Sequence, residues 1–201
     1  MNTIITVVFT VTYLLIALFH CRGMVLRTKD LCMCSLMIAL TLVLECIQIP
    51  LPTGARLPLV SMLPLMFLAV YNYKLAIFSG FVTGIMALLL VPGWQPVHWG
   101  QVFVEHMVCF SCIGFTGVLG SQTKKRLVAG FLVASVLKLC GHILSGVLFF
   151  SQNAWEGWGA WGYSISYNLS QNVPLVIMCG VVFFAIPLKT INMVLKVRDR
   201  T

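Results

Sequence analysis

Residues 138–168 read KLCGHILSGVLFFSQNAWEGWGAWGYSISYN. They place Lys138 and His142 within an apolar run of membrane length, and a cluster of Trp, Gly, Tyr and Asn residues follows at once. Anchoring at the lipid interface explains scattered Trp residues, but it does not explain this density beside ionisable groups. The stretch therefore predicts a membrane-spanning helix that leads into a ligand pocket at one membrane face.

The chain around this stretch has the composition of an integral membrane protein. Of its 201 residues, 60% are hydrophobic and 9% are charged, which leaves more apolar surface than a soluble domain could cover. A transmembrane helix needs about 20 mostly apolar residues. The candidates are residues 3–20, 30–50, 58–73, 75–92, 101–120, 127–150 and 168–188. Their apolar runs are continuous rather than alternating, so we expect an all-α bundle and not a barrel.

Two details refine this bundle. Four prolines, Pro50, Pro52, Pro58 and Pro64, interrupt the second and third segments, so we expect a kinked or partly re-entrant stretch there. The first segment has no Lys or Arg before Arg22 and no clear cleavage site, which favours a retained helix over a signal peptide. The spans leave no room for a soluble catalytic domain, so residues 1–201 are expected to form a single transmembrane domain.

The net charge of +8 indicates membrane orientation rather than nucleic-acid binding. Basic residues follow the first, third, fifth and last segments, and the positive-inside rule places all of these clusters in the cytoplasm. They are Arg22, Arg27 and Lys29; Lys74; Lys124, Lys125 and Arg126; and Lys189, Lys196, Arg198 and Arg200. Arg56 is the basic residue of the opposite loops. The chain should therefore be multi-pass, with its N-terminus outside and its C-terminus inside.

The eight cysteines are expected to be small apolar residues of the bundle. Most lie within spans, and they form no dense framework of loop cysteines. Cys109 and Cys112 have the CxxC spacing, but no second ligand pair accompanies them, so a metal or redox site is not expected.

Several polar side chains from separate segments share one depth near the outer face. They are Glu105, His142, Tyr163 and Asn168. Gln101 lies one helical turn above Glu105 on the same face. This convergence is the main indication of a pocket.

Each of these residues also has a structural explanation. A charge at the centre of a membrane costs about 2.5–3.5 kcal/mol on insertion scales, so it faces the bundle interior whether or not it binds a ligand. We favour a binding role for Glu105, while for His142 alone the two explanations are balanced. Lys138 is expected to pair away from the pocket or with Glu105, because an unpaired ammonium would repel a cation. Glu45 is expected to reach the outer interface.

The aromatic and the small residues also have both a structural and a functional explanation. Trp155, Trp158 and Trp161 are individually typical of interfacial anchors, although the glycines between them let the rings approach one another. Small residues recur at Ala76, Gly80 and Gly84, and at Ser35 and Ala39. Such spacing serves packing inside the bundle or docking to a partner helix.

The pocket chemistry suits a small organic cation with a flat polar ring. A carboxylate attracts the charge, aromatic rings add cation–π contacts of about 0.5–2 kcal/mol each, and Asn, Tyr and His supply directional hydrogen bonds. No nucleophile with its base, phosphate loop or metal cluster is recognisable, and no cofactor is expected. Uptake is therefore favoured over two alternatives: a membrane enzyme acting on a lipid, with Glu105 and His106 as its candidate pair, and an assembly subunit.

Two motifs now connect the chain to a known family. The pattern KxxxHxxxGxxFxSQxAWxGWGAxxYSxxxN from Lys138 to Asn168, with QxFxE from Gln101 to Glu105, resembles the thiamine-specific substrate-binding (S) components of energy-coupling factor (ECF) vitamin transporters, the ThiT family. The resemblance implies a six-helix vitamin-binding bundle over residues 28–190 in the bacterial plasma membrane, with residues 3–20 as an extra N-terminal helix. It implies no enzymatic activity.

The same resemblance implies a ligand and partners. The ligand would be thiamine or a close analogue, such as a phosphate ester or pyrimidine precursor, with another vitamin as the alternative. The partners would be a transmembrane coupling subunit and two cytoplasmic ATPases. The expected substrate-binding residues are Glu105, His142, Phe150, Tyr163, Asn168, His106 and Trp158, and Ser35 and Ala39 would contact the coupling subunit. Phe150 stands where the family has Trp, and the loop around Ala55 lacks another Trp.

Overall fold

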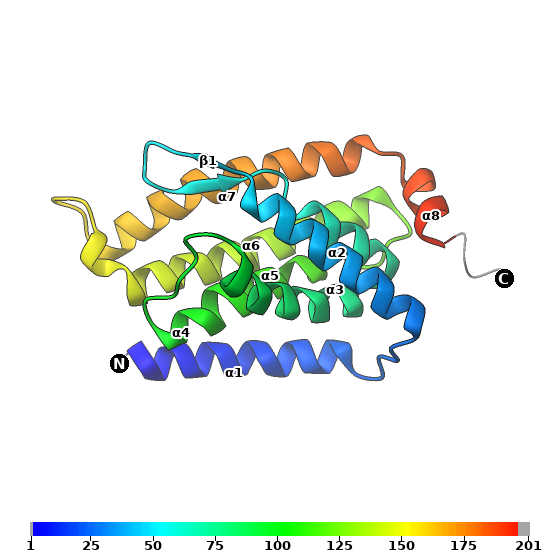
Figure 1. Cartoon of the computed structure of the whole chain (residues 1–201), viewed down its shortest axis with the longest axis horizontal. Helices are drawn as coiled ribbons and strands as arrows, with labels where there is room; N and C mark the ends of the chain where they lie inside the picture. The colour runs from blue at the N-terminus through cyan, green and yellow to red at the C-terminus, as the bar shows by residue number, and fades with distance from the viewer. Residues whose placement is uncertain (1, 197–201) are drawn as a thin grey trace.

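The computed structural model describes residues 2–196, which form a bundle of long helices (Figure 1). The long helices are α1 (Asn2–Cys21), α2 (Thr28–Cys46), α3 (Leu63–Leu90), α6 (Lys124–Phe149) and α7 (Ala160–Ala185), and α8 (Leu188–Lys196) is short. Four helices, α1, α3, α6 and α7, are long and apolar enough to cross a membrane. The predicted all-α membrane fold is confirmed. Arg198 and Arg200 of the last predicted basic cluster lie outside the described residues.

Helix α3 is interrupted, although not at any of the prolines that predicted a kink. Asn72 interrupts it with non-helical angles (φ −158°, ψ 110°). Lys74 Nζ donates to the carbonyl of Arg22 at 2.8 Å, which places this break beside the link between α1 and α2. Cys46 at the other end of α2 approaches the carbonyl of Leu90, 3.9 Å away. Before the break, Leu59 donates to the carbonyl of Ile47 at the far end of α2 and Tyr71 donates to Asp30 in the first turn of α2. The chain therefore reverses near Asn72, in agreement with the predicted boundary between residues 73 and 75.

The stretch before α3 differs from the prediction, because it forms a small β-hairpin. Strands β1 (Gln48–Pro50) and β2 (Arg56–Pro58) pair antiparallel. Gly54 takes φ +84° in the connecting turn, a conformation that glycine adopts without strain. Prolines lack the amide hydrogen that a helix needs, which explains why α2 ends at Cys46 rather than near residue 50.

A continuous helical segment covers most of the predicted fifth span. It consists of α4 (Trp99–Gln101), the π-helix η1 (Val102–Val108), α5 (Cys109–Cys112) and the 3₁₀ helix η2 (Ile113–Gly117). Glycines of α3 touch this segment directly: a Cβ on Gly84 would lie 2.3 Å from the carbonyl oxygen of His106, and one on Gly80 would lie 2.5 Å from Ser111 Cα. The small residues at 80 and 84 therefore serve packing inside the bundle.

Helix α7 begins earlier than predicted. It starts at Ala160 rather than Asn168, with Gly159 as its extended N-cap. The Gly and Trp residues favoured a loop, because glycine costs about 1 kcal/mol in a helix interior, but packing of the first α7 turns against α6 outweighs this local preference. Tyr163 and Asn168 consequently lie on one helix.

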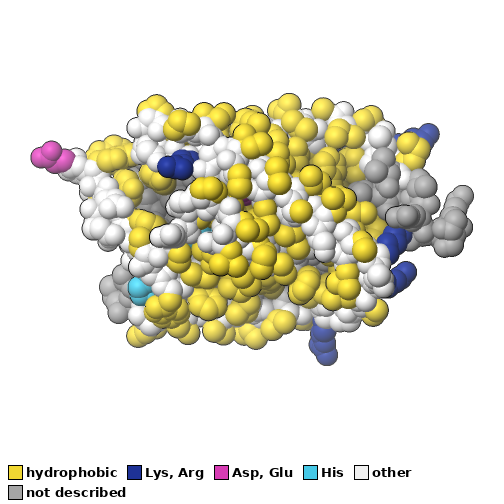
Figure 2. Space-filling view, viewed as in Figure 1, with side chains coloured by type: hydrophobic (Ala, Val, Ile, Leu, Met, Phe, Trp, Pro, Cys, Tyr) yellow, Lys and Arg dark blue, Asp and Glu magenta, His cyan; other side chains and the backbone are white. Residues whose placement is uncertain are grey.

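Charged side chains separate toward the two ends of the bundle. Hydrophobic side chains cover the visible flank, and most of the visible Lys and Arg side chains gather at the end where α8 lies (Figure 2). The N-terminus and the β-hairpin lie at the opposite end (Figure 1). This distribution is typical of a multi-pass membrane protein.

Candidate ligand-binding site

The polar residues that were predicted to converge line two neighbouring cavities at the hairpin end of the bundle. The larger cavity has a volume of about 280 Å³ and the smaller about 160 Å³. Both are lined by Glu105, His142, Phe150, Tyr167 and Asn168. The shared lining means that Glu105 and His142 lie where the two cavities meet.

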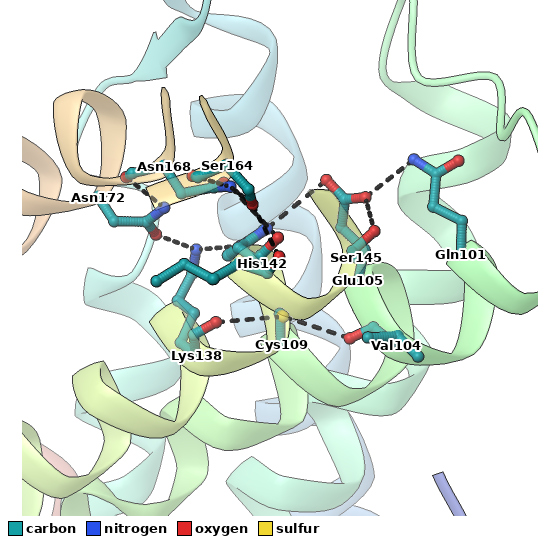
Figure 3. Close-up of polar contacts among 11 residues, drawn as sticks. Gln101, Val104, Glu105, Cys109, Lys138, His142, Ser145, Ser164, Asn168 and Asn172 are labelled. Atoms are coloured by element: carbon teal, nitrogen blue, oxygen red, sulfur yellow. Dashed lines mark hydrogen bonds and ion pairs between the residues drawn. The ribbon is translucent and has the colours of Figure 1, made fainter. Parts of the chain in front are cut away.

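Glu105 is the acceptor at this junction. Gln101 Nε2 donates to its Oε2 at 2.9 Å, and Ser145 Oγ donates to the same oxygen at 2.8 Å (Figure 3). The predicted alignment of Gln101 with Glu105 is therefore confirmed. Glu105 lies in the π-helix η1, and π-helical turns are frequent at functional sites. Since 26% of its side chain remains exposed, the carboxylate can also accept from a ligand.

His142 connects Glu105 to Lys138. Lys138 Nζ lies 2.7 Å from His142 Nε2 and donates to Asn172 Oδ1 at 2.9 Å (Figure 3). Because an ammonium group can only donate, His142 Nε2 accepts and Nδ1 carries the proton. Nδ1 lies 3.6 Å from Glu105 Oε1. Lys138 is therefore paired, but it also lines the larger cavity, so the expected pairing away from the pocket or with Glu105 is wrong. Asn172 is the partner that sequence reasoning missed.

Asn168 holds α7 against α6. Its Nδ2 donates to the carbonyl of Ser164 at 2.9 Å and to that of His142 at 3.2 Å. Gly146 permits this contact, because a Cβ there would lie 2.2 Å from Ser164 Oγ. With its side-chain nitrogen used internally and its backbone carbonyl accepting from Asn172 Nδ2, Asn168 has its side-chain oxygen Oδ1 available to accept from a ligand.

Aromatic rings form much of the remaining lining. Phe150 and Tyr167 line both cavities, Tyr163 lines the smaller one, and Trp94 lines the larger one. Trp94 packs 5.4 Å from the ring of His106. Sequence reasoning missed Trp94, and its position in the Pro-Gly-Trp turn after α3 was the available signal. It supplies a Trp ring to a site whose hairpin loop has none.

The geometry corrects the prediction for Glu45 and shows where Trp158 and Arg56 lie. Trp158 lines neither cavity, and its ring packs against Trp155 while 48% of the residue is exposed. Glu45 does not reach the interface, because it is 4% exposed and lines the larger cavity. Arg56, interpreted only as an outer-loop residue, also lines the larger cavity. Folding of the hairpin back over the bundle explains the last two differences.

The remaining candidate residues lie inside and outside the cavity lining. His106 lines the larger cavity as expected. All eight cysteines are free, and Cys109 Sγ donates to the carbonyls of Val104 and Lys138. Within residues 2–196, no group of three or more His, Cys, Asp or Glu side chains could hold a metal ion. Ser35 and Ala39 are exposed on α2, away from these cavities.

Known proteins resemble this chain in sequence and in structure. The family model described as "Thiamine transporter protein" matches residues 31–195. The thiamine transporter ThiT of Bacillus subtilis is 24% identical over 164 residues, which cover 74% of this chain and 84% of that protein. ThiT of Lacticaseibacillus paracasei is 28% identical over 130 residues, 56% of this chain and 65% of that protein.

A solved structure also matches. ThiT from Listeria monocytogenes superposes with a TM-score of 0.70 at 25% sequence identity, covering 81% of this chain and 94% of that one. The family match begins at residue 31, so helix α1 lies outside it.

Proposed function

The chain belongs to the thiamine transporter protein family, and we propose that it takes up thiamine by binding it in the two cavities that meet at Glu105. The observation that carries this proposal is the junction itself, where one carboxylate lies among aromatic rings and hydrogen-bonding groups. Thiamine is a permanent cation with a flat aminopyrimidine ring, and this lining complements both features. The matched relatives are transporters rather than enzymes.

Individual residues receive roles from their positions. Glu105 attracts the positive charge of the ligand. Its Oε1 can also accept a hydrogen bond from the ligand, because the nearest donor in the protein, His142 Nδ1, lies 3.6 Å away. Asn168 and Tyr163 offer polar contacts to the pyrimidine edge, and Phe150 offers a ring face. His142 orients Glu105 and separates it from the ammonium of Lys138.

Transport requires partners that supply energy, and we place these at the cytoplasmic end. Ser35 and Ala39 are exposed four residues apart on α2, so one helix of a coupling subunit could approach closely along them. Two cytoplasmic ATPases would complete the complex. In this arrangement the N-terminus and the cavity mouth face outward, and the basic end faces the cytoplasm.

Calorimetric titration of the purified chain with thiamine, followed by uptake measurements in cells, tests the proposal. We expect saturable binding by the chain alone, and uptake only when the coupling subunit and ATPases are also present. Exchange of both Ser35 and Ala39 for Leu should leave binding intact and abolish uptake, whereas Leu at Val181, exposed on another helix, α7, serves as the control. Absence of thiamine binding by the folded protein would refute the proposed function.

A further inference from the structure

A histidine begins the helical segment that carries Glu105. His98 is the N-cap of α4, and its Nδ1 accepts a hydrogen bond from the backbone N–H of Gly100 at 3.0 Å. The usual N-caps are Ser, Thr, Asp and Asn, whose oxygens remain acceptors near neutral pH. A ring nitrogen accepts only while the imidazole is neutral, because both nitrogens of the protonated ring carry hydrogens. This cap therefore exists in only one protonation state of His98.

Gln101 connects this cap to Glu105. Its Oε1 accepts from the backbone N–H of Val97 at 2.9 Å, and its Nε2 donates to Glu105 Oε2 at 2.9 Å (Figure 3). Gln101 stands three residues after the N-cap, where a Gln or Glu typically reaches back to the start of a helix and completes a capping box. His98 and Gln101 thus close the start of the segment together, and Gln101 also holds the carboxylate.

Packing holds the His98 ring in the orientation that the cap needs. The ring stacks on that of Phe149, with the centroids 5.0 Å apart and an angle of 18° between the planes. A Cβ on Gly100 would lie 2.9 Å from Phe149 Cζ and 2.9 Å from Thr6 Cγ2, so α6 and α1 enclose the capped turn. His98 itself is half-buried at the end of the bundle where the N-terminus of α1 lies (Figure 1). Protons can therefore reach it from that side of the membrane.

The groups that His98 bonds to and stacks on do not titrate. They are the Gly100 amide and the rings of Trp99 and Phe149. On the elements that pack here, the titratable side chains nearest in sequence are Glu105 and His106 on η1, His142 on α6 and Tyr13 on α1. The first three line the larger cavity, so their own titration also acts on ligand binding. A comparison between variants of His98 at each pH separates its contribution from theirs.

Resting on the proposed thiamine site, we propose that His98 is a positioning residue whose neutral ring holds Glu105 ready for the ligand, so that acidification of the outer medium weakens binding. A histidine ordinarily changes its charge between about pH 5 and 8. Protonation turns Nδ1 of His98 from an acceptor into a donor that faces the Gly100 N–H, and it places a positive charge at the positive end of a helix. The cap then opens, Gln101 is no longer fixed, and a smaller fraction of the protein has Glu105 in the binding position.

Two substitutions of His98 separate capping from packing in calorimetric titrations of the full chain with thiamine. Asn is a preferred N-cap that does not titrate, so His98→Asn should bind like the wild type at about pH 8. On acidification to about pH 5.5, the wild type should lose about fivefold more affinity than His98→Asn, the factor that corresponds to a typical N-cap. His98→Phe can stack on Phe149 but cannot accept, so it should bind about fivefold more weakly than the wild type already at about pH 8.

His20→Asn is the matched control. His20 is also half-buried and packs against aromatic rings, those of Tyr73 and Phe115, but it lies in the last turn of α1, at the opposite end of that helix. This variant should keep the acid sensitivity of the wild type. An equal loss of affinity on acidification in the wild type and in His98→Asn would overturn the proposal.

Hydrogen–deuterium exchange of the ligand-free proteins gives a measurement that does not depend on thiamine. At about pH 5.5 the amides of residues 100–105 should exchange faster in the wild type than in His98→Asn, and at about pH 8 the two should be equal. Equal exchange at both pH values would also overturn the proposal. If the wild type bound no thiamine at either pH, the proposed function would fail and the effect on binding with it, whereas exchange would still show whether His98 caps the segment.

Discussion

At the scale of single residues, the site depends on a Lys and a Glu that do not touch. His142 lies between them, 2.7 Å from Lys138 Nζ and 3.6 Å from Glu105 Oε1. The imidazole of His142 therefore orients the Glu105 carboxylate, while the Lys138 ammonium donates a hydrogen bond to Asn172. Although Lys138 lines the larger cavity, two hydrogen-bond partners hold its ammonium group.

Replacing Lys138 by Met should lower both thiamine affinity and stability. The change leaves His142 Nε2 and Asn172 Oδ1 without a donor inside the bundle, at a cost of about 1–3 kcal/mol for each unpaired group. Titration with thiamine and thermal unfolding in detergent would measure the two effects. Lys125→Met, at an exposed position in the first turn of α6, is the control. Unchanged affinity and unchanged unfolding temperature would show that the network has no role.

A site residue could be predicted from the sequence when its partner lies nearby on the same helix. The pairs Gln101–Glu105 and Lys138–His142 are each four residues apart on one helix, so helical periodicity identifies them. Glu45 reaches the cavity from α2, Trp94 from the loop after α3 and Arg56 from strand β2, and nothing local in the sequence fixes their direction.

At the scale of elements, glycines determine how closely the helix bearing Glu105 approaches its neighbours. Gly84 of α3 touches the backbone at His106, and Gly141 of α6 lies against Cys109, where a Cβ would come within 2.6 Å of Sγ. Pairs of small residues could be recognised from sequence as packing or docking surfaces. The helices that they contact could not be recognised, because a spacing of four residues does not indicate which neighbouring helix the small residues face.

Gly84→Ala should weaken thiamine binding and reduce the yield of folded protein. The new Cβ would lie 2.3 Å from the carbonyl oxygen of His106, so the π-helix that carries Glu105 must shift, and overpacking of this kind costs about 1–3 kcal/mol. Gly159→Ala is the matched control, since nothing lies within 4 Å of a Cβ at that position. Equal affinity and yield for the two variants would argue against close packing at Gly84.

Helix α1 braces the same segment from the other side. Tyr13 donates to Ser111 Oγ at 2.8 Å and packs edge-on against Phe81 and Phe115. Tyr13→Phe should therefore destabilise the protein by about 0.5–1.5 kcal/mol, the net value of one hydrogen bond. Thermal unfolding in detergent would measure this, with Leu15→Ala, 63% exposed on α1, as the control. If Tyr13→Phe unfolded no earlier than the control, α1 would not brace the site through this bond.

At the scale of the whole molecule, hydrophobic runs and basic clusters were sufficient to predict an all-α membrane bundle. Apolar length and charge position are properties of each segment alone, so sequence reveals them. The hairpin at residues 48–58 and the early start of α7 were not predictable in this way, because tertiary packing determines both.

Orientation is a prediction about the molecule as a whole. Because Arg22, Lys74 and Lys124 all belong to one end of the bundle, the positive-inside rule places the C-terminus in the cytoplasm. A green fluorescent protein fused after Thr201 should therefore fluoresce in bacterial cells, and an alkaline phosphatase fused at the same place should be inactive. The reverse pattern would invert the predicted topology.

The central claim is that a cationic vitamin binds where the cavities meet at Glu105. Quenching of intrinsic Trp fluorescence by thiamine, compared between the wild type and Glu105→Gln, tests it most directly, since Trp94 lines the larger cavity. We predict saturable quenching in the wild type and an affinity lower by about 1.5–3 kcal/mol in the variant, the value of a hydrogen bond to a charged group. Equal affinities for the two proteins, or no saturable quenching by a folded wild type, would contradict the claim.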